Sequence, residues 1–188
     1  HYLRDVLRLA PGAPLRLFNG RDGEWRAAIG KLTKSGGTLA VEAQTRKQSP
    51  SPDLWLVFAA TKRAAIDLVA EKATELGVGT IVPVLSSRSV VRLDERQAGK
   101  KLRHWQAIVA GACEQCGRSR VPEIRPPQEL SSYLASSSRE GQRLVLSPTG
   151  PASLAGLTSV GSRVELLIGP EGGLDDGELE RAAASGYV

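Results

Sequence analysis

Cysteine and histidine are scarce in this sequence, and their scarcity limits the chemistry open to it. The 188 residues include only Cys113, Cys116, His1 and His104. Two cysteines are too few for a disulfide framework. A structural zinc site needs four ligands, and His104 falls in the same predicted helix as the cysteine pair, so we expect no metal. The pair closes a helix, whereas a thioredoxin-like pair opens one, so we interpret it as two small residues near a helix end.

Long apolar runs and the common phosphate-binding motifs are absent as well. No apolar run approaches the ~20 residues of a membrane-spanning helix. The N-terminal residues have no basic-then-apolar signal pattern, so we expect a cytoplasmic protein, and because the first residue is His1 we expect the native start to lie upstream. Neither G-x-x-x-x-G-K-[ST] nor G-x-G-x-x-G occurs, which argues against a nucleoside triphosphate or a dinucleotide in the usual binding modes.

Positive charge is in modest excess. Lys and Arg number 25 against 20 Asp and Glu, a formal net charge of +5. Such a balance favours an anionic partner without requiring one. Cations gather in the first 47 residues at Arg4, Arg8, Arg16, Arg21, Arg26, Lys31 and Lys34. Each of them alone is best explained as a solvated surface residue, but together they make RNA contact credible for this segment.

Residues 1–47 have the pattern of a small β-rich unit. A short helix is predicted over residues 1–9, and strands over residues 14–18, 24–32 and 38–44. Asn-Gly and Asp-Gly pairs mark turns between the first two strands. Closely spaced short strands are typical of a small barrel. Residues 48–53 are rich in Ser and Pro and are predicted to be a linker.

Residues 54–188 alternate between strand and helix patterns. Strands are predicted at residues 54–60, 80–85, 121–124, 144–147 and 164–168, and helices at residues 61–76, 94–116, 128–135 and 175–185. The first of these helices has an apolar stripe that ends at Leu76, and Pro83 is expected to restrict pairing of the second strand. The alternation predicts an α/β fold with a mostly parallel sheet covered on both faces.

Residues 164–174 form the stretch around which this second segment is organised. An apolar run of strand length, predicted to be buried on both faces, leads into a loop with three glycines, and Asp175 with Glu178 has the spacing of a capping box. Ligands of open α/β sheets bind at the carboxyl ends of strands, and glycines let a ligand approach backbone N–H groups. A tight turn that needs glycine for its dihedral angles explains the same pattern, and the residues alone leave both interpretations open.

Two further groups of residues are candidates for binding. The strand ends at residues 59–62, 147–151 and 169–173 can line one nucleoside-sized pocket. At the end of the long helix, Glu114, Gln115, Arg118 and Arg120 cluster within seven residues. This cluster is either a solvated helix terminus or a contact to RNA or a base, and we favour the contact.

Four motifs in register resemble one known family. They are Glu71-Lys72-Ala73-Thr74-Glu75-Leu76-Gly77-Val78, Arg88-Ser89-Val90, Glu114-Gln115-Cys116-Gly117-Arg118 and Ile168-Gly169-Pro170-Glu171-Gly172-Gly173-Leu174. The set resembles the RsmE family, whose members methylate N3 of a uridine in 16S ribosomal RNA of the small subunit. Residues 1–8 are similar to the start of that family's first domain.

The resemblance implies an α/β fold with a SPOUT-type trefoil knot in residues 54–188, preceded by a PUA-like β-barrel in residues 1–47 that binds RNA. It implies S-adenosyl-L-methionine (SAM) as methyl donor, no metal, and a homodimer whose active site uses both subunits. The substrate is then small-subunit ribosomal RNA, naked or in the assembled subunit. It also implies that the polypeptide continues past Val188, since Gly186-Tyr187-Val188 looks like a helix stop and the start of the knot's closing strand.

The resemblance also implies roles for individual residues. Those expected to bind SAM are Leu146, Ser147, Pro148, Thr149, Gly150, Ile168, Gly169, Pro170, Glu171, Gly172 and Gly173. From the chemistry of the reaction, Arg118 or Arg120 of the partner subunit is expected to stabilise charge on the uracil. The basic first segment and the cluster at the helix end make Arg4, Arg8, Glu114, Gln115 and Arg118 the residues expected to bind RNA. Two alternatives stay open, namely a non-catalytic RNA-binding protein and a uracil-C5 methyltransferase that uses Cys113 or Cys116 as nucleophile.

Overall fold

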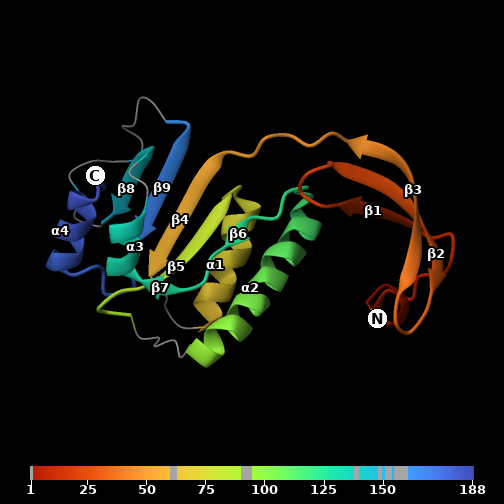
Figure 1. Cartoon of the computed structure of the whole chain (residues 1–188), viewed down its shortest axis with the longest axis horizontal. Coiled ribbons are helices and arrows are strands. Elements are labelled where there is room, and N and C mark those ends of the chain that lie inside the picture. The colour runs from red at the N-terminus through yellow and green to blue at the C-terminus, as the bar shows by residue number, and fades with distance from the viewer. Residues whose placement is uncertain are drawn as a thin grey trace. The chain divides into compact units, whose positions relative to one another are not determined.

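The computed structural model describes residues 2–59, 63–89, 95–137, 140–147, 150, 154 and 161–188 (Figure 1). The chain divides into two compact units, of which the first ends at Pro50 and the second begins at Ser51. Each unit is described separately below.

The first unit is built on a three-stranded antiparallel sheet. A π-helix, η1 (Tyr2–Val6), precedes β1 (Pro14–Phe18), β2 (Glu24–Leu32) and β3 (Gly37–Arg46), and the strand order is β1-β2-β3. Gly20 and Gly23 follow the predicted turn residues and have φ angles of 77° and 78°, which glycine adopts without strain. Ala27 and Ile29 of β2 are buried, whereas every residue of β3 is exposed. Among the described strands, β1 and β3 are edge strands with one partner each, so closure into a barrel stays a prediction.

The second unit has a parallel sheet at its centre. Its strands are β4 (Asp53–Ala59), β5 (Thr80–Leu85), β6 (Glu123–Ile124), β7 (Gln128–Glu129), β8 (Gln142–Leu146) and β9 (Arg163–Ile168). The order is β6-β5-β4-β9-β8, β7 also pairs with β5, and each pairing is parallel. The parallel sheet predicted from the alternation of strands and helices is confirmed.

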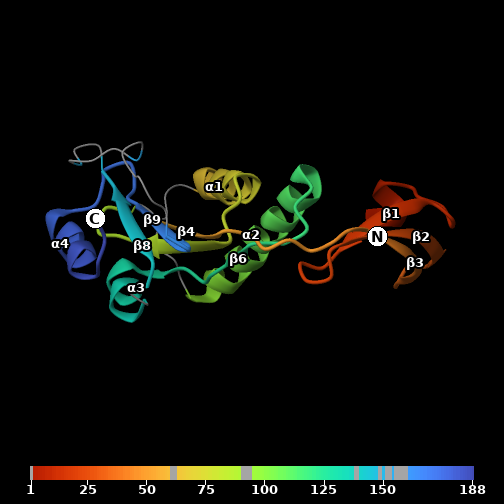
Figure 2. The ribbon, with the colours of Figure 1, turned by 90° about the horizontal axis from the view of Figure 1, so that it is seen from above.

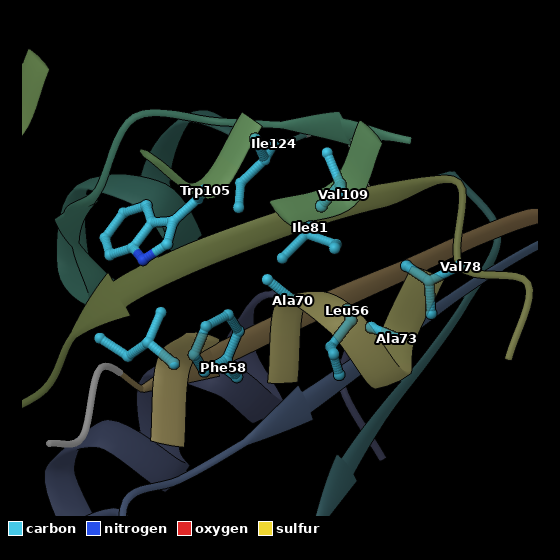
Figure 3. Packing of buried hydrophobic residues seen from close by; sticks show 10 residues of the cluster. Leu56, Phe58, Ala70, Ala73, Val78, Ile81, Trp105, Val109 and Ile124 are labelled. Carbon is cyan, nitrogen blue, oxygen red and sulfur yellow. The ribbon is translucent and has the colours of Figure 1, made fainter. Parts of the chain in front are cut away.

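Helices lie on both faces of this sheet (Figure 2). They are α1 (Arg63–Glu75), α2 (Glu95–Cys116), α3 (Leu130–Ser136) and α4 (Asp176–Ala184). On one face Phe58 and Ile81 pack with Ile66 of α1 and with Trp105 and Val109 of α2, and Figure 3 shows most of this cluster. The opposite face carries a second cluster, in which α3 and α4 cover Val57, Val82 and Leu167. Neighbouring residues of one strand thus enter different cores, as the twofold repeat of a strand requires.

Two sequence expectations in this unit have different outcomes. Leu76 does not continue the apolar stripe of α1, because the helix ends at Glu75 and Leu76 is 82% exposed. Pro83 does coincide with a restricted pairing. On the side of β5 away from β4, the ladder pairs Ile81 with β6 and resumes only at Val84 with β7. A proline lacks the N–H that a continuous ladder would require there.

The last residues of the chain lie alongside β8. The Val188 N–H donates to Arg143 O at 3.0 Å, and Val188 O accepts from the Val145 N–H at 2.9 Å. These two bonds flank Leu144 and have the pattern of a parallel ladder. Gly186, with a φ of 89°, separates this segment from α4. The expectation that Tyr187 and Val188 begin strand-like pairing after a helix stop is therefore confirmed.

A buried polar network fixes the same segment from beneath. Glu165 of β9 is fully buried and accepts hydrogen bonds from the hydroxyls of Tyr133, at 2.7 Å, and Tyr187. The Arg143 guanidinium lies 3.1 Å from the same carboxylate and donates to Ser185 O at 2.5 Å. Burial, reinforced by the hydrogen bond to Glu165, raises the pKa of both tyrosines well above the ordinary value.

Candidate active site

The loop that follows β9 occupies the carboxyl edge of the parallel sheet. Strand β9 lies between β4 and β8, and Leu167 is fully buried, whereas Ile168 at its end is 36% exposed. The chain then turns through residues 169–175 into α4. Inside this turn the Gly173 N–H donates to Pro170 O at 2.8 Å, which closes a β-turn over residues 170–173.

The three glycines of this loop serve different purposes. A Cβ at Gly169 would lie 3.0 Å from Leu174 N and 3.1 Å from Gly173 C, so the loop's own backbone would have to shift by a few tenths of an ångström to accept a side chain there. Gly173 has a φ of 71°, which strains any residue with a side chain. At Gly172, by contrast, the nearest neighbour of an added Cβ is Arg88 Cδ at 3.5 Å, an ordinary contact. The turn interpretation therefore explains Gly169 and Gly173, but packing and dihedral angle do not require glycine at position 172.

Helix α4 begins with the predicted capping box. The Asp175 carboxylate accepts from the Glu178 N–H at 2.7 Å, and Glu178 Oε2 accepts from the Asp175 N–H at 3.0 Å. A hydrogen bond from Ser87 and the bond from the Glu178 N–H lower the pKa of Asp175. The box holds the start of α4 rigidly, so the glycine loop is tied at both ends to regular structure.

The loop after β8 starts beside the loop after β9. Leu146 and Ile168 are paired residues at the ends of two neighbouring parallel strands, so both predicted SAM segments leave the sheet at one edge. Ser147 and Gly150 follow, with the Gly150 N–H donating to Ser147 O at 3.2 Å. Pro148 and Thr149 lie outside the described residues, as do residues 60–62 of the third predicted strand end. The described parts of the two segments are thus brought together as the sequence predicted.

The cluster at the end of α2 lies at the opposite edge of the sheet. Arg118 follows Gly117, whose φ of 73° ends the helix, and its guanidinium donates to Thr74 O at 2.6 Å and to Val78 O at 2.9 Å. These carbonyls lie at the end of α1 and in the turn before β5, at the amino edge of the sheet, where its parallel strands begin. Glu114, Gln115 and Arg120 are exposed near the same edge. Within one chain, the arginines and the glycine loop are therefore separated by the length of the strands.

Cys113 and Cys116 differ in their surroundings. Cys113 is buried, and burial raises the pKa of its thiol. A raised pKa reduces the thiolate fraction, and the thiolate is the nucleophilic form. Cys116 is exposed, and its Sγ lies 3.9 Å from Cys113 O. The buried cysteine is thus a poor candidate for a nucleophile at uracil C5.

In the first unit, the two arginines predicted to bind RNA are close to the N-terminus of the sequence. Arg4 makes two hydrogen bonds to the Asp5 carboxylate, at 2.6 and 2.7 Å. Arg8 is exposed and has a φ of 52°, an unusual left-handed conformation for a residue with a side chain. The charge of Arg4 is thus partly offset by the Asp5 carboxylate, so Arg8 is the better candidate of the two for a phosphate contact.

Among the described residues, no cluster of three or more His, Cys, Asp or Glu side chains is suited to hold a metal ion. No helix in the described ranges is long and apolar enough to cross a membrane.

Sequence relatives point to one kind of protein. The chain is 29% identical to the ribosomal RNA small subunit methyltransferase E of Buchnera aphidicola subsp. Schizaphis graminum, with 100% of this chain and 77% of that protein aligned. It is also 29% identical to the protein of the same name from Synechocystis, of which it covers 62%.

Solved structures agree with the sequence relatives. A Legionella pneumophila structure determined with the bound cofactor SAM superposes with a TM-score of 0.90 at 31% identity, covering 99% of this chain and 77% of that one. The ribosomal RNA small subunit methyltransferase E of Neisseria gonorrhoeae, bound to S-adenosyl methionine, has a TM-score of 0.87 at 29% identity, covering 98% and 77%.

Family models divide the chain between two domains. A model of the RNA methyltransferase PUA domain matches residues 1–42, and a model of the RNA methyltransferase domain matches residues 47–188. The second match includes the parallel sheet, the glycine loop and the capped helix α4, and it extends over more than half of the sequence. The chain therefore belongs to the RNA methyltransferase domain family, and it is similar in sequence to proteins named ribosomal RNA small subunit methyltransferase E.

Proposed function

We propose that this protein transfers a methyl group from SAM to N3 of a uridine in 16S ribosomal RNA of the small subunit. The observation that carries the proposal is the adjacency of Leu146 and Ile168. They place two glycine-containing loops side by side at the carboxyl edge of a parallel sheet, in a chain similar to two structures that hold SAM. Ribosome assembly takes place in the cytoplasm, so we propose that location for the protein.

The donor is proposed to lie against residues 146–150 and 168–173. Gly172 supports this fit, because packing and dihedral angle do not require glycine there, and a residue without a Cβ lets a ligand approach the backbone closely. When bound, SAM supplies a methyl group that is already electrophilic. The chain's own task is then to hold the backbone edge of the loop rigid, to exclude water and to keep the uracil nitrogen in line.

Charge stabilisation is proposed to come from a second copy of the chain. Loss of the uridine N3 proton leaves negative charge on the uracil oxygens, which a guanidinium can stabilise. Arg118 and Arg120 lie at the amino edge of their own sheet, so they can reach a glycine loop only across a dimer interface. We propose Arg120 for this role, because the guanidinium of Arg118 is already bound to carbonyls at the end of α1.

The first unit is proposed to bind the RNA backbone. The match to the PUA domain and the cations of residues 1–47 support an RNA platform, and we propose that this unit closes into a PUA-like barrel, joined by residues 48–53 to the catalytic domain of residues 54–188. Arg4 and Arg8, with Glu114 and Gln115 near α2's end, are the proposed RNA contacts. We further propose that the second domain has the SPOUT trefoil knot.

The test is methyl transfer by the full-length protein from labelled SAM to 16S RNA and to assembled small subunits, with mass spectrometry of the product nucleosides. We expect 3-methyluridine. No transfer despite RNA binding would identify a non-catalytic RNA-binding protein instead. A 5-methyluridine product that disappears when Cys113 and Cys116 are replaced with serine would identify the cysteine mechanism.

A further inference from the structure

The loop after β5 crosses to the glycine loop at the carboxyl edge. Strands β5 and β9 are the two neighbours of β4, and all three are parallel, so the loops after β5 and β9 leave the sheet on either side of the end of β4. Arg88-Ser89-Val90, in the first of these loops, is one of the four family motifs, but the sequence alone indicates no role for it. Val90 lies outside the described residues, whereas Arg88 and Ser89 are described.

Three hydrogen bonds tie the loop after β5 to the glycine loop and to α4, and we call Ser87, Arg88, Gly172 and Glu178 the cross-loop clamp. The Arg88 Nη1 donates to Gly172 O at 2.6 Å. One residue earlier, the Ser87 N–H donates to Glu178 Oε1 at 2.8 Å, and the Ser87 hydroxyl lies 3.2 Å from Glu178 Oε2. Glu178 is only 4% exposed, and its carboxylate binds both the Asp175 N–H at the start of α4 and the Ser87 N–H in the loop after β5.

Hydrogen bonds between Ser86 and Ser89 close the loop after β5 into a turn. The Ser86 N–H donates to Ser89 Oγ at 3.0 Å, and the Ser89 N–H donates back to Ser86 O at 3.0 Å. The two hydroxyl oxygens also lie 3.0 Å apart. Arg88 therefore extends from a closed turn, and its guanidinium reaches the glycine loop from a defined position.

The arginine binds the peptide unit between the two adjacent glycines of the loop. The peptide between Gly172 and Gly173 is flanked on both sides by residues that have broad conformational freedom. Its N–H donates to Pro170 O at 2.8 Å, and its carbonyl accepts from Arg88 at 2.6 Å. Both ends of one peptide plane are thus held. Without Arg88 only the N–H end keeps its hydrogen bond, and rotation of this plane would redirect the backbone groups proposed to face the donor.

We propose that Arg88 is a positioning residue of the methyltransferase, which holds the glycine loop in the conformation that receives SAM. This inference rests on the proposed function, because it takes residues 168–173 as part of the donor site. A loop that populates its binding conformation only in part binds its ligand more weakly by that fraction. Arg88 does not touch the RNA in this scheme, so its removal affects the donor and spares the acceptor.

The experiment compares Arg88→Ala with Arg181→Ala in the full-length protein. Arg181 of α4 is exposed and also lowers the pKa of Asp175 through its charge, but no hydrogen bond described here links its side chain to the loop. Arg181→Ala therefore removes a nearby cation and leaves the clamp intact. Calorimetry measures the SAM dissociation constant, and steady-state kinetics separates KM for SAM, KM for RNA and kcat.

We expect Arg88→Ala to raise the dissociation constant and KM for SAM about tenfold, while kcat at saturating SAM and KM for RNA stay within about twofold. Arg88→Lys retains one donor and should recover part of the loss, and Arg181→Ala should match the wild type. In the ligand-free protein, hydrogen exchange should accelerate in the peptide that contains residues 169–175 in Arg88→Ala alone.

Three results would overturn the inference. If Arg88→Ala binds SAM as the wild type does, the clamp does not position the site although the proposed function stands. If Arg181→Ala weakens SAM binding equally, the effect belongs to charge and not to the Gly172 bond. If the wild-type protein itself binds no SAM, the proposed function and this inference fail together, and the exchange rates then show only whether the clamp orders the loop.

Discussion

Gly172 gives the sharpest test of the candidate donor site, because its substitution separates ligand binding from folding. An added Cβ meets nothing of the protein closer than Arg88 Cδ at 3.5 Å, and Gly172 is not among the glycines with positive φ. We therefore expect Gly172→Ala to change the free energy of unfolding by no more than about 0.5 kcal/mol. A ligand packed against this backbone would instead meet the new methyl group.

The loss of affinity follows from the size of that overlap. Inserting a methyl group into a well-packed contact costs about 1–3 kcal/mol. At about 1.4 kcal/mol for each factor of ten, the dissociation constant for SAM should rise roughly 5- to 150-fold in Gly172→Ala. The branched side chain of Gly172→Val should abolish measurable binding, again with a cooperative thermal transition close to that of the wild type.

Gly169→Ala is the matched control in the same loop. Its Cβ would lie 3.0 Å from Leu174 N, so the backbone must shift, and we expect a loss of stability of about 1–3 kcal/mol. Thermal denaturation and calorimetry with SAM on the three variants measure the two effects independently. If both Gly172 variants bind SAM as the wild-type protein does, the glycine loop is not part of the donor site and the reasoning from the open Cβ position is wrong.

Three further outcomes are expected. Arg118→Ala should lower the free energy of unfolding, measured by urea denaturation, by about 1–3 kcal/mol, because carbonyls at the end of α1 lose their donor. Arg120→Ala should change the free energy of unfolding by no more than about 0.5 kcal/mol and yet slow methyl transfer. Arg8→Glu should weaken RNA binding and reduce the slope of log K against log salt by about one unit, measured by titration at several salt concentrations, with SAM affinity unchanged. Because the pKa values of Tyr133 and Tyr187 are raised, the folded state keeps two protons that the unfolded state loses above pH ~10. The tyrosines' contribution to the free energy of unfolding should therefore be constant below that pH and fall above it by up to about 2.7 kcal/mol per pH unit. Urea melts across that pH range measure this slope, which the double Phe variant should remove.

Local sequence patterns determined the order and type of most elements. The strand before the glycine loop, the capping box of Asp175 and Glu178, and the glycine stops at Gly117 and Gly186 all follow from spacings of a few residues. Such features depend on backbone geometry and on hydrogen bonds between near neighbours, so they can be predicted without knowledge of the fold. The loop positions of the candidate site follow from the same patterns, because parallel strands end at one edge.

The partners of individual side chains could not be predicted in this way. Arg118 was one of two arginines expected to stabilise charge on the uracil from the partner subunit. In the structure its guanidinium binds carbonyls some 40 residues away in sequence, a contact that no local pattern indicates. Arg88 belongs to a family motif whose role the sequence does not indicate, and only the strand order places its loop beside Gly172. A one-dimensional pattern records which residues are polar, but not which distant backbone group each of them meets.

The tertiary structure also decided which glycine the ligand hypothesis rests on. From the sequence, Gly169, Gly172 and Gly173 were equivalent, since each removes a Cβ from a loop after a strand. Only the packed loop distinguishes them: Gly169 faces the backbone of Leu174, Gly173 requires a positive φ, and the Cβ position of Gly172 meets only the Arg88 side chain, at an ordinary contact distance. Composition and spacing determined that the loop is rich in glycine, whereas the surroundings of each Cα, which depend on chain segments far apart in sequence, determined what each glycine is for.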